Sequence, residues 1–207
     1  MKRMLLSLFP LALFCQGADW VNLANGKNLD GWEVVGDGLW SVMRDGTILG
    51  QRGPKSLRQS WIYTRKDYAE YDLSLEYWTR ERGNSGVSIR DTSRGAQACG
   101  ANWVADKTPS HIGYEIQIWM GPESTDYPSG SIYLFDKATT GAQIPNDWNR
   151  MEIESRASGI RVKINGRVVS QHAGDPKRSQ TGPIGLQLHD AASIVMFRNL
   201  KIREVTR

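Results

Sequence analysis

Polar side chains alternate with apolar ones in the segment from residue 114 to residue 119. In Tyr-Glu-Ile-Gln-Ile-Trp, the side chains of Glu115, Gln117 and Trp119 would share one face of an extended strand, at intervals of roughly 6.5 to 7 Å. The other face is apolar and suits a protein core. A carboxylate, an amide and an aromatic ring in a row can move a proton, bind hydroxyl groups and stack on a flat apolar surface.

Three further segments show the same alternation. Their polar faces carry Gln187 with His189, Ser88 with Arg90, and Glu76 with Trp78. A strand face that only meets solvent is usually built from Thr, Lys, Ser and Glu. The combination of Glu, Gln, His, Arg and Trp is more typical of a face that binds sugar hydroxyls and stacks on their C–H surfaces. A solvated sheet face is the alternative.

These side chains need strands to position them, and short segments with period-two alternation run through most of the chain. Strands are expected at residues 40–43 and 47–49 around an Asp-Gly turn, and at 60–64, 71–79, 86–90, 113–119, 131–135, 151–155, 160–164, 168–171, 184–189 and 194–204. About a dozen short strands predict an all-β, two-sheet sandwich. Residues 91–112 lack periodicity, and a loop of that length is expected to shape a site.

The amino terminus has the layout of a secretory signal peptide. Lys2 and Arg3 precede a mostly apolar run from Met4 to Phe14, which is followed by small residues at 17 and 18. The run is too short to span a bilayer. Because Phe14 precedes Cys15 where a lipoprotein signal needs a small residue, we expect cleavage after residue 17 or 18 rather than lipidation, and export to the periplasm or the medium.

The remaining 189 residues, 19–207, suit one domain with a sizeable core and carry a net charge of +2. Lys and Arg are scattered among Asp and Glu, which argues against a nucleic-acid partner, and no segment is long and apolar enough to span a membrane. Cys99 is the single cysteine left, so no internal disulfide is expected. The composition predicts nothing about the oligomeric state.

Several short motifs resemble, in order, those of the bacterial 3-keto-disaccharide hydrolase domain family. They are Asn25-Gly26-Lys27-Asn28-Leu29-Asp30-Gly31-Trp32, Asn84-Ser85-Gly86-Val87 with Arg90, Gly113-Tyr114-Glu115-Ile116-Gln117, Gly130-Ser131-Ile132-Tyr133, Asp147-Trp148-Asn149, Gly182-Pro183-Ile184-Gly185-Leu186-Gln187-Leu188-His189 and Phe197-Arg198-Asn199. Each motif is short, but together they span nearly the whole expected mature chain. The resemblance implies a concanavalin A-like jelly-roll sandwich with a sugar site on its concave face. It also implies action on glucosides already oxidised at carbon 3.

The carboxylates of the 114–119 segment do not fit ordinary retaining glycoside hydrolysis. Retaining enzymes need two carboxyl groups about 5 to 5.5 Å apart. Here Gln117 stands where the partner of Glu115 would lie, although Glu76 could supply a second carboxylate from another strand. The ordinary endoglucanase is therefore disfavoured.

A 3-keto sugar offers another route, because the ketone acidifies the neighbouring C2–H. A single base can remove that proton, and the oxygen at C1 can then leave by β-elimination, followed by hydration. The hypothesis assigns Glu115 or His189 as the base, with Arg90 as the partner of the enolate. The amides of Gln117 and Gln187, together with Glu76, Trp119 and Tyr133, are the predicted substrate-binding residues.

Two alternatives and the place of one further residue stay open. A divalent metal on Glu115 and His189 could polarise the ketone, although one Glu and one His make a weak metal signal. The chain could instead be a non-catalytic carbohydrate-binding module, because fold does not fix function. His111, in the long aperiodic segment, could lie at the rim of the site.

Overall fold

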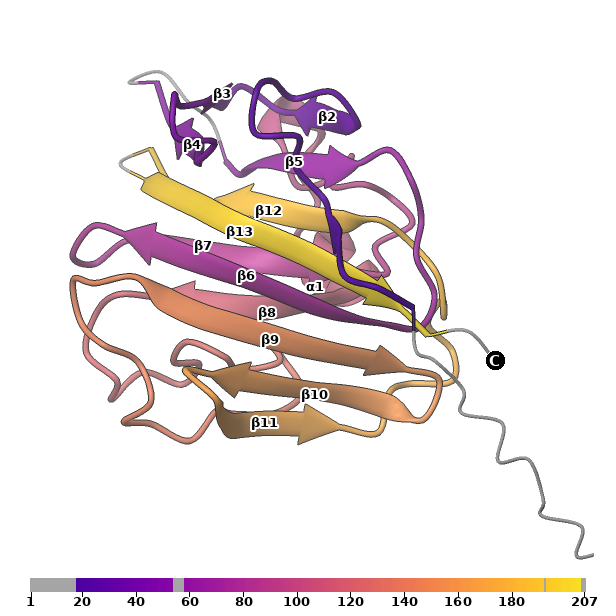
Figure 1. Ribbon diagram of the computed structural model, residues 1–207. Helices are drawn as coiled ribbons and strands as arrows, with labels where there is room; N and C mark the ends of the chain where they lie inside the picture. The colour runs from indigo at the N-terminus through magenta and orange to yellow at the C-terminus, as the bar shows by residue number, and fades with distance from the viewer. Residues whose placement is uncertain (1–17, 54–57, 192, 206–207) are drawn as a thin grey trace, which may run out of the picture.

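The computed structural model describes residues 18–53, 58–191 and 193–205, which form two antiparallel sheets packed face to face. Figure 1 shows the larger sheet in front and the smaller one behind it. This arrangement confirms the predicted all-β sandwich.

The larger sheet has the order β11-β10-β9-β6-β13-β4-β3, and β1 pairs with β13. Its strands are β1 (Val21–Asn22), β3 (Leu39–Val42), β4 (Ile48–Gln51), β6 (Tyr71–Thr79), β9 (Asn149–Arg156), β10 (Gly159–Ile164), β11 (Arg167–His172) and β13 (Ile194–Glu204). The smaller sheet has the order β2-β5-β12-β7-β8. Its strands are β2 (Trp32–Val35), β5 (Ser60–Thr64), β7 (Asn84–Ile89), β8 (Tyr114–Trp119) and β12 (Ile184–Leu188).

The aperiodic segment 91–112 contains three short helical turns. These are η1 (Gly100–Asn102), η2 (Ala105–Lys107) and α1 (Pro109–Ile112), and α1 leads directly into β8 and packs against it. Among the described residues, none of the helices has the length and apolar character needed to cross a bilayer.

Most of the predicted strands are confirmed within one or two residues, but the strand expected at 131–135 is wrong. Ile132 makes only isolated bridges, to Ile116 and Asp136, and the chain turns back at Leu134, which has a φ of +73°. A turn was missed here because alternating residue types do not reveal backbone direction. The predicted signal peptide lies outside the described residues, except for its last position.

The core between the sheets is built from the apolar faces that the alternation predicted. Tyr71, Leu73, Leu75 and Tyr77 of β6 are at most 1 % exposed and belong to the same cluster as apolar residues of the smaller sheet. From the smaller sheet this cluster includes Val87, Ile89, Tyr114, Ile116, Ile118, Ile184, Leu186 and Leu188.

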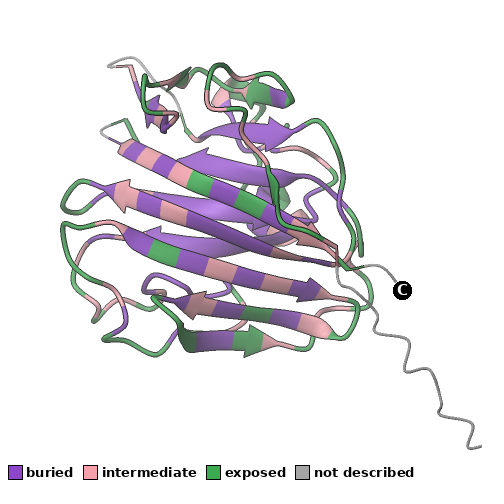
Figure 2. Ribbon diagram, viewed as in Figure 1, coloured by how far each residue is buried: buried purple, intermediate pink, exposed green. Residues whose placement is uncertain are grey.

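The two sheets differ on their outer faces, as Figure 2 shows. Strands β9, β10 and β13 alternate between buried and more exposed residues, so the outer face of the larger sheet meets solvent. In contrast, β5 and β12 are buried at every position, and β7 and β8 at all but one. Their polar residues therefore face a covered space rather than bulk water.

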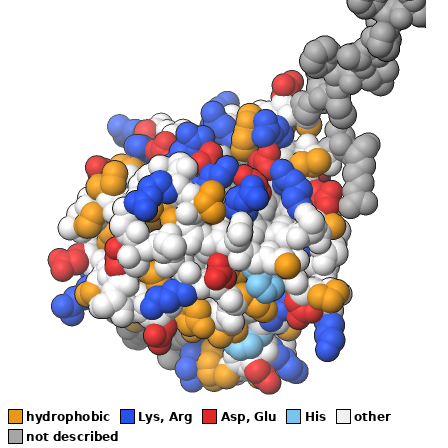
Figure 3. All heavy atoms as spheres, turned by 90° about the horizontal axis from the view of Figure 1, so that it is seen from below, with side chains coloured by type: hydrophobic (Ala, Val, Ile, Leu, Met, Phe, Trp, Pro, Cys, Tyr) orange, Lys and Arg blue, Asp and Glu red, His pale blue; other side chains and the backbone are white. Residues whose placement is uncertain are grey.

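Charged side chains of both signs are interspersed over the surface seen in Figure 3. No extensive single-sign patch is visible on that face, in keeping with the scattered charges of the sequence. Single-sign patches of Lys and Arg are the usual footprint of nucleic-acid binding.

Candidate functional site

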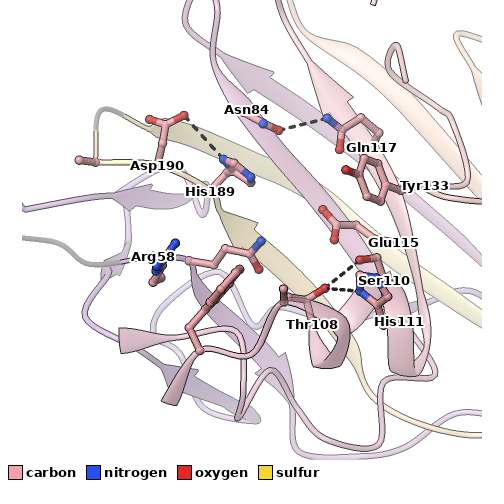
Figure 4. Close-up of a pocket in the computed structure, with 14 residues that line it drawn as sticks. Arg58, Asn84, Thr108, Ser110, His111, Glu115, Gln117, Tyr133, His189 and Asp190 are labelled. Atoms are coloured by element: carbon pink, nitrogen blue, oxygen red, sulfur yellow. Dashed lines mark hydrogen bonds and ion pairs between the residues drawn. The ribbon is translucent and has the colours of Figure 1, made fainter. Parts of the chain in front are cut away.

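A cavity of about 540 Å³ lies on the outer side of the smaller sheet. Figure 4 shows side chains from several strands and from the 91–112 segment converging on it. Its lining is made by Arg58, Gln59, Asn84, Trp103, Ala105, Thr108, Ser110, His111, Glu115, Gln117, Tyr133, His189, Asp190 and Ala191. Polar groups that converge in a concave cavity mark a candidate small-molecule site, and amide and carboxyl groups are suited to binding hydroxyl groups.

Strand register places Glu115 beside Gly86 of the neighbouring strand β7, where the missing side chain leaves a gap in the sheet surface. Glu115 of β8 lies opposite Ser88 of β7, and Gln117 lies opposite Gly86. A Cβ at Gly86 would come within 2.8 Å of Glu115 Oε1, so the glycine makes room for the carboxyl group to lie across β7. On the far side of that gap, Gln187 Nε2 of β12 donates to Glu115 Oε1 at 2.9 Å.

The Glu115 carboxyl is 5 % exposed, and its environment favours the protonated form. Burial raises the pKa of Glu115 to about 7, the Gln187 hydrogen bond opposes that rise, and the negative charge of Asp91 adds to it. A carboxyl group with such a pKa can both accept and return a proton near neutral pH, which suits general acid–base catalysis.

Two more predicted binding residues line the cavity beside Glu115. Gln117 Nε2 donates to Asn84 Oδ1 at 3.2 Å, so these side chains form an amide pair in the wall. The ring of Tyr133 lies near Glu115 in Figure 4 and packs on Tyr127, with a centroid separation of 4.5 Å. Amides and a supported tyrosine are suited to binding sugar hydroxyls.

His189 lines the cavity on the side opposite Glu115, next to Asp190 (Figure 4). Its Nδ1 lies 3.9 Å from Asp190 Oδ2. Desolvation lowers the pKa of His189 below its usual value, although Asp190 opposes this and Arg52 reinforces it. The imidazole is therefore largely neutral at pH 7.

Five further lining residues lie outside the strands, where periodicity gives no signal. His111 Nδ1 is 2.9 Å from Thr108 Oγ1, which is also 3.0 Å from Ser110 Oγ. These contacts fix the imidazole of His111 on the same side of the cavity as Glu115 (Figure 4). Arg58 lies over the ring of Trp103, 4.1 Å from its centroid. Of these loop residues, only His111 was expected at the rim, because of its residue type and its place in the aperiodic segment.

Gln187 and Trp119 do not line the cavity. Gln187 is 0 % exposed and reaches the site only through its hydrogen bond to Glu115, so it positions the carboxyl instead of touching a ligand. Trp119 ends β8 and donates from Nε1 to the carbonyl of Pro122 at 3.2 Å. Its ring folds onto Gly121 because the chain turns there.

The placement predicted for Arg90 is wrong. Strand β7 ends at Ile89, and Arg90 has a φ of +59°, which breaks the alternation that put it on the face of Ser88. Its side chain is instead buried between the sheets. There the guanidinium donates to Ser155 Oγ, to the carbonyl of Arg156 and to Gln180 Oε1 at 2.8 to 3.2 Å. We therefore give Arg90 a structural role.

Glu76 also lies away from the cavity, because β6 belongs to the larger sheet and its polar face points outward. Its carboxylate accepts hydrogen bonds from Arg198 Nε at 2.6 Å and Asn199 Nδ2 at 3.0 Å. Glu76 cannot serve as a second carboxylate for Glu115.

A Glu76→Gln substitution is accordingly expected to leave kcat and KM within about twofold of the wild type. It should lower the free energy of unfolding by about 0.5 to 1 kcal/mol, the usual contribution of a partly exposed ion pair. Steady-state kinetics and urea unfolding of the variant test both statements. A hundredfold loss of kcat would return Glu76 to the reaction.

The alternative of a metal bound by Glu115 and His189 lacks further ligands. Among the described residues, no group of three or more His, Cys, Asp or Glu side chains is arranged to hold an ion. Oε1 of Glu115 already accepts a hydrogen bond from the Gln187 amide, and the side chains of Glu115 and His189 lie on opposite sides of the cavity. The donor set does not fit a resident metal.

Solved structures with the same fold include two proteins of Parabacteroides distasonis named putative glycosyl hydrolases. One is 24 % identical with a TM-score of 0.71, covering 90 % of this chain and 100 % of its own. The other is 22 % identical with a TM-score of 0.68, covering 92 % and 95 %. A carbohydrate-binding module of family CBM66 from Bacillus subtilis is 16 % identical with a TM-score of 0.60, covering 86 % and 98 %.

No curated protein matches the chain. The family described as 3-keto-alpha-glucoside-1,2-lyase-like domain matches residues 19–203, which is most of the sequence. The chain therefore belongs to the 3-keto-alpha-glucoside-1,2-lyase-like domain family.

Proposed function

We propose that the protein is an exported enzyme that cleaves 3-keto-glycosides by β-elimination, with Glu115 as the general base. The observation that carries this proposal is one buried carboxyl at the cavity wall whose pKa is raised to about 7. The family to which the chain belongs is described by the same class of chemistry.

In the proposed reaction, Glu115 removes the proton from C2, which the C3 ketone has made acidic. The electron pair passes through the C3 enolate and forms the C1=C2 double bond, while the C1–O bond breaks and its electrons leave with the aglycone oxygen. The Oε1 atom of Glu115 is bonded to Gln187, and no hydrogen bond to Oε2 is found among the described residues. Oε2 is therefore the oxygen assigned to the proton transfer.

The reaction also needs a proton donor for the leaving oxygen and hydrogen-bond donors for the ketone. The departing oxygen needs a proton, and His111, which Thr108 holds on the same side of the cavity as Glu115, is the residue assigned to supply it. The amide pair of Gln117 and Asn84, together with the Tyr133 hydroxyl, offers hydrogen-bond donors to the ketone oxygen and the ring hydroxyls. Addition of water to the enone then yields the free keto sugar.

The paired carboxylates of a retaining glycosidase are not needed for this route. The acids that line the cavity among the described residues are Glu115 and Asp190, and Asp190 lies across the cavity beside His189 (Figure 4). A substrate that brings its own activation, in the form of the 3-ketone, requires only one base.

The pH dependence of the reaction follows from the raised pKa of Glu115. Since the base must be ionised, kcat/KM is expected to increase tenfold per pH unit below about pH 7 and to level off above it. A glutamate with the ordinary pKa of 4.5 would place the bend of the profile near pH 4.5 instead. Initial rates from pH 5 to 9 decide between the two; a flat profile from pH 5 to 7 would contradict the role of Glu115.

Three substrates separate this proposal from its alternatives. The protein is incubated with a 3-keto-disaccharide, with the unoxidised parent disaccharide and with a β-glucan. The proposal requires turnover of the keto sugar alone, with an enone or its hydrate as product. A carbohydrate-binding module would bind ligand and cleave none of them, and a glucanase would cleave the glucan.

A further inference from the structure

Arg58 is a cation at the cavity that no acid neutralises. The described residues include every Asp and Glu of the chain, and none of them forms an ion pair with Arg58. Most of the other arginines of the fold pair with an acid, including Arg156, Arg198 and Arg203. An unpaired guanidinium at a cavity wall has its N–H groups available for a ligand.

The backbone of Arg58 is held in a conformation that a side chain rarely adopts. Its φ is +63°, in the left-handed region that is strained for residues other than glycine. Two neighbours fix it there: Cys99 forms a bridge with Arg58, and the buried guanidinium of Arg52 donates to the carbonyl of Arg58. Strain that the surroundings maintain is a feature of ligand sites, and here it accompanies the placement of a cation at the cavity.

Two neighbours of Arg58 in the lining, Trp103 and Gln59, support the cation and add a hydrogen-bond donor. The ring of Trp103 supports the guanidinium from one side at 4.1 Å, and among the described residues no hydrogen bond from the guanidinium of Arg58 is found. Gln59 Oε1 accepts from Trp61 Nε1 at 3.0 Å, so the Gln59 Nε2 group is its remaining polar group. Asp190, an acid of the lining that lies on the same side of the cavity as Arg58 in Figure 4, is 3.9 Å from His189 Nδ1 and forms no ion pair with Arg58. A cluster of donors on a cation matches a carboxylate, which only accepts hydrogen bonds.

Figure 4 shows Arg58 across the cavity from Glu115, and a volume of about 540 Å³ exceeds what one sugar ring requires. Building on the proposed function, we propose that Arg58, Gln59 and Trp103 form an aglycone subsite for a carboxylate. The preferred substrates are then 3-keto-glycosides whose leaving group is acidic, such as an aldonic acid.

The test compares two ligands that differ only at the aglycone. One is a 3-keto-disaccharide, and the other is the same compound with its reducing end oxidised to the aldonate. Dissociation constants are measured calorimetrically on the Glu115→Gln protein, which leaves the ligand intact, and kcat/KM is measured on the wild type. The aldonate is expected to bind about tenfold more tightly, an advantage that salt reduces.

A matched pair of variants locates the preference. Arg58→Gln should abolish it, whereas Arg44→Gln should preserve it, because Arg44 makes the same change of charge in the exposed turn between β3 and β4. Equal affinity for the two ligands, or a preference that survives in Arg58→Gln, would overturn the subsite. A binding preference without any turnover would instead contradict the proposed reaction and leave the subsite standing, so the two failures are distinguishable.

Discussion

A Glu115→Gln variant is expected to cleave 3-keto-disaccharides with a kcat about 100- to 10,000-fold below that of the wild type. Removal of a positioned general base has this magnitude of effect. The amide has nearly the same shape and can still accept from Gln187 Nε2, so the geometry around Gly86 is preserved while the ability to take the C2 proton is lost. Single-turnover kinetics with saturating enzyme measure the chemical step without contributions from binding.

Two controls separate lost chemistry from lost structure in this variant. Because the pKa of Glu115 is raised from the ordinary value of 4.5 to about 7, its stabilising contribution is complete below pH 4.5 and is gone above pH 7. The glutamine variant should therefore be at least as stable as the wild type at pH 8. Glu76→Gln makes the same chemical change outside the cavity and should keep full activity. Undiminished kcat in Glu115→Gln would remove Glu115 from the mechanism.

An Arg90→Met variant is expected to lose stability and retain its chemistry. Arg90 is 1 % exposed and its guanidinium donates to Ser155, Arg156 and Gln180, so its removal leaves buried acceptors without donors. We expect the free energy of unfolding to decrease by about 2 to 4 kcal/mol, with a Tm lower by roughly 5 to 15 °C. Well below that Tm, kcat per folded molecule should match the wild type.

The comparison for this variant is Arg150→Met. Arg150 lies on β9, the strand that Arg90 contacts, but is largely exposed in an ion pair with Glu152, so its loss should change stability by less than about 1 kcal/mol. Thermal unfolding and kinetics of both variants decide the role of Arg90. A large decrease of kcat in Arg90→Met at unchanged Tm would restore the catalytic role that its residue type suggested.

The alternation of residue types predicted the faces of the strands well, because burial of one face imposes period two on the sequence. Tyr114, Ile116 and Ile118 enter the core as expected, while Glu115 and Gln117 line the cavity. The same alternation could not reveal which sheet a strand joins. Glu76 shows the polar pattern of Glu115, yet its strand pairs into the other sheet and turns that face to solvent.

The alternation of polar and apolar residues could not predict backbone conformations that interrupt a strand. Arg90 continues the alternation of β7 in sequence, but its positive φ turns the side chain to the opposite side of the sheet. For the same reason the loop residues of the cavity, including Arg58 and Thr108, carried no signal, since long-range packing places them and no local period does. His111 was recognised only by its chemistry.

Release of deuterium from carbon 2 tests the central claim most directly. A 3-keto-disaccharide labelled at C2 is incubated with wild type, with Glu115→Gln and without enzyme, and deuterium in the early product and in the solvent is measured. Elimination by Glu115 predicts that the wild-type product has lost the label to solvent, with neither cleavage nor release above background in the variant. A sugar product that keeps its C2 deuterium would show direct hydrolysis at C1 and contradict the account.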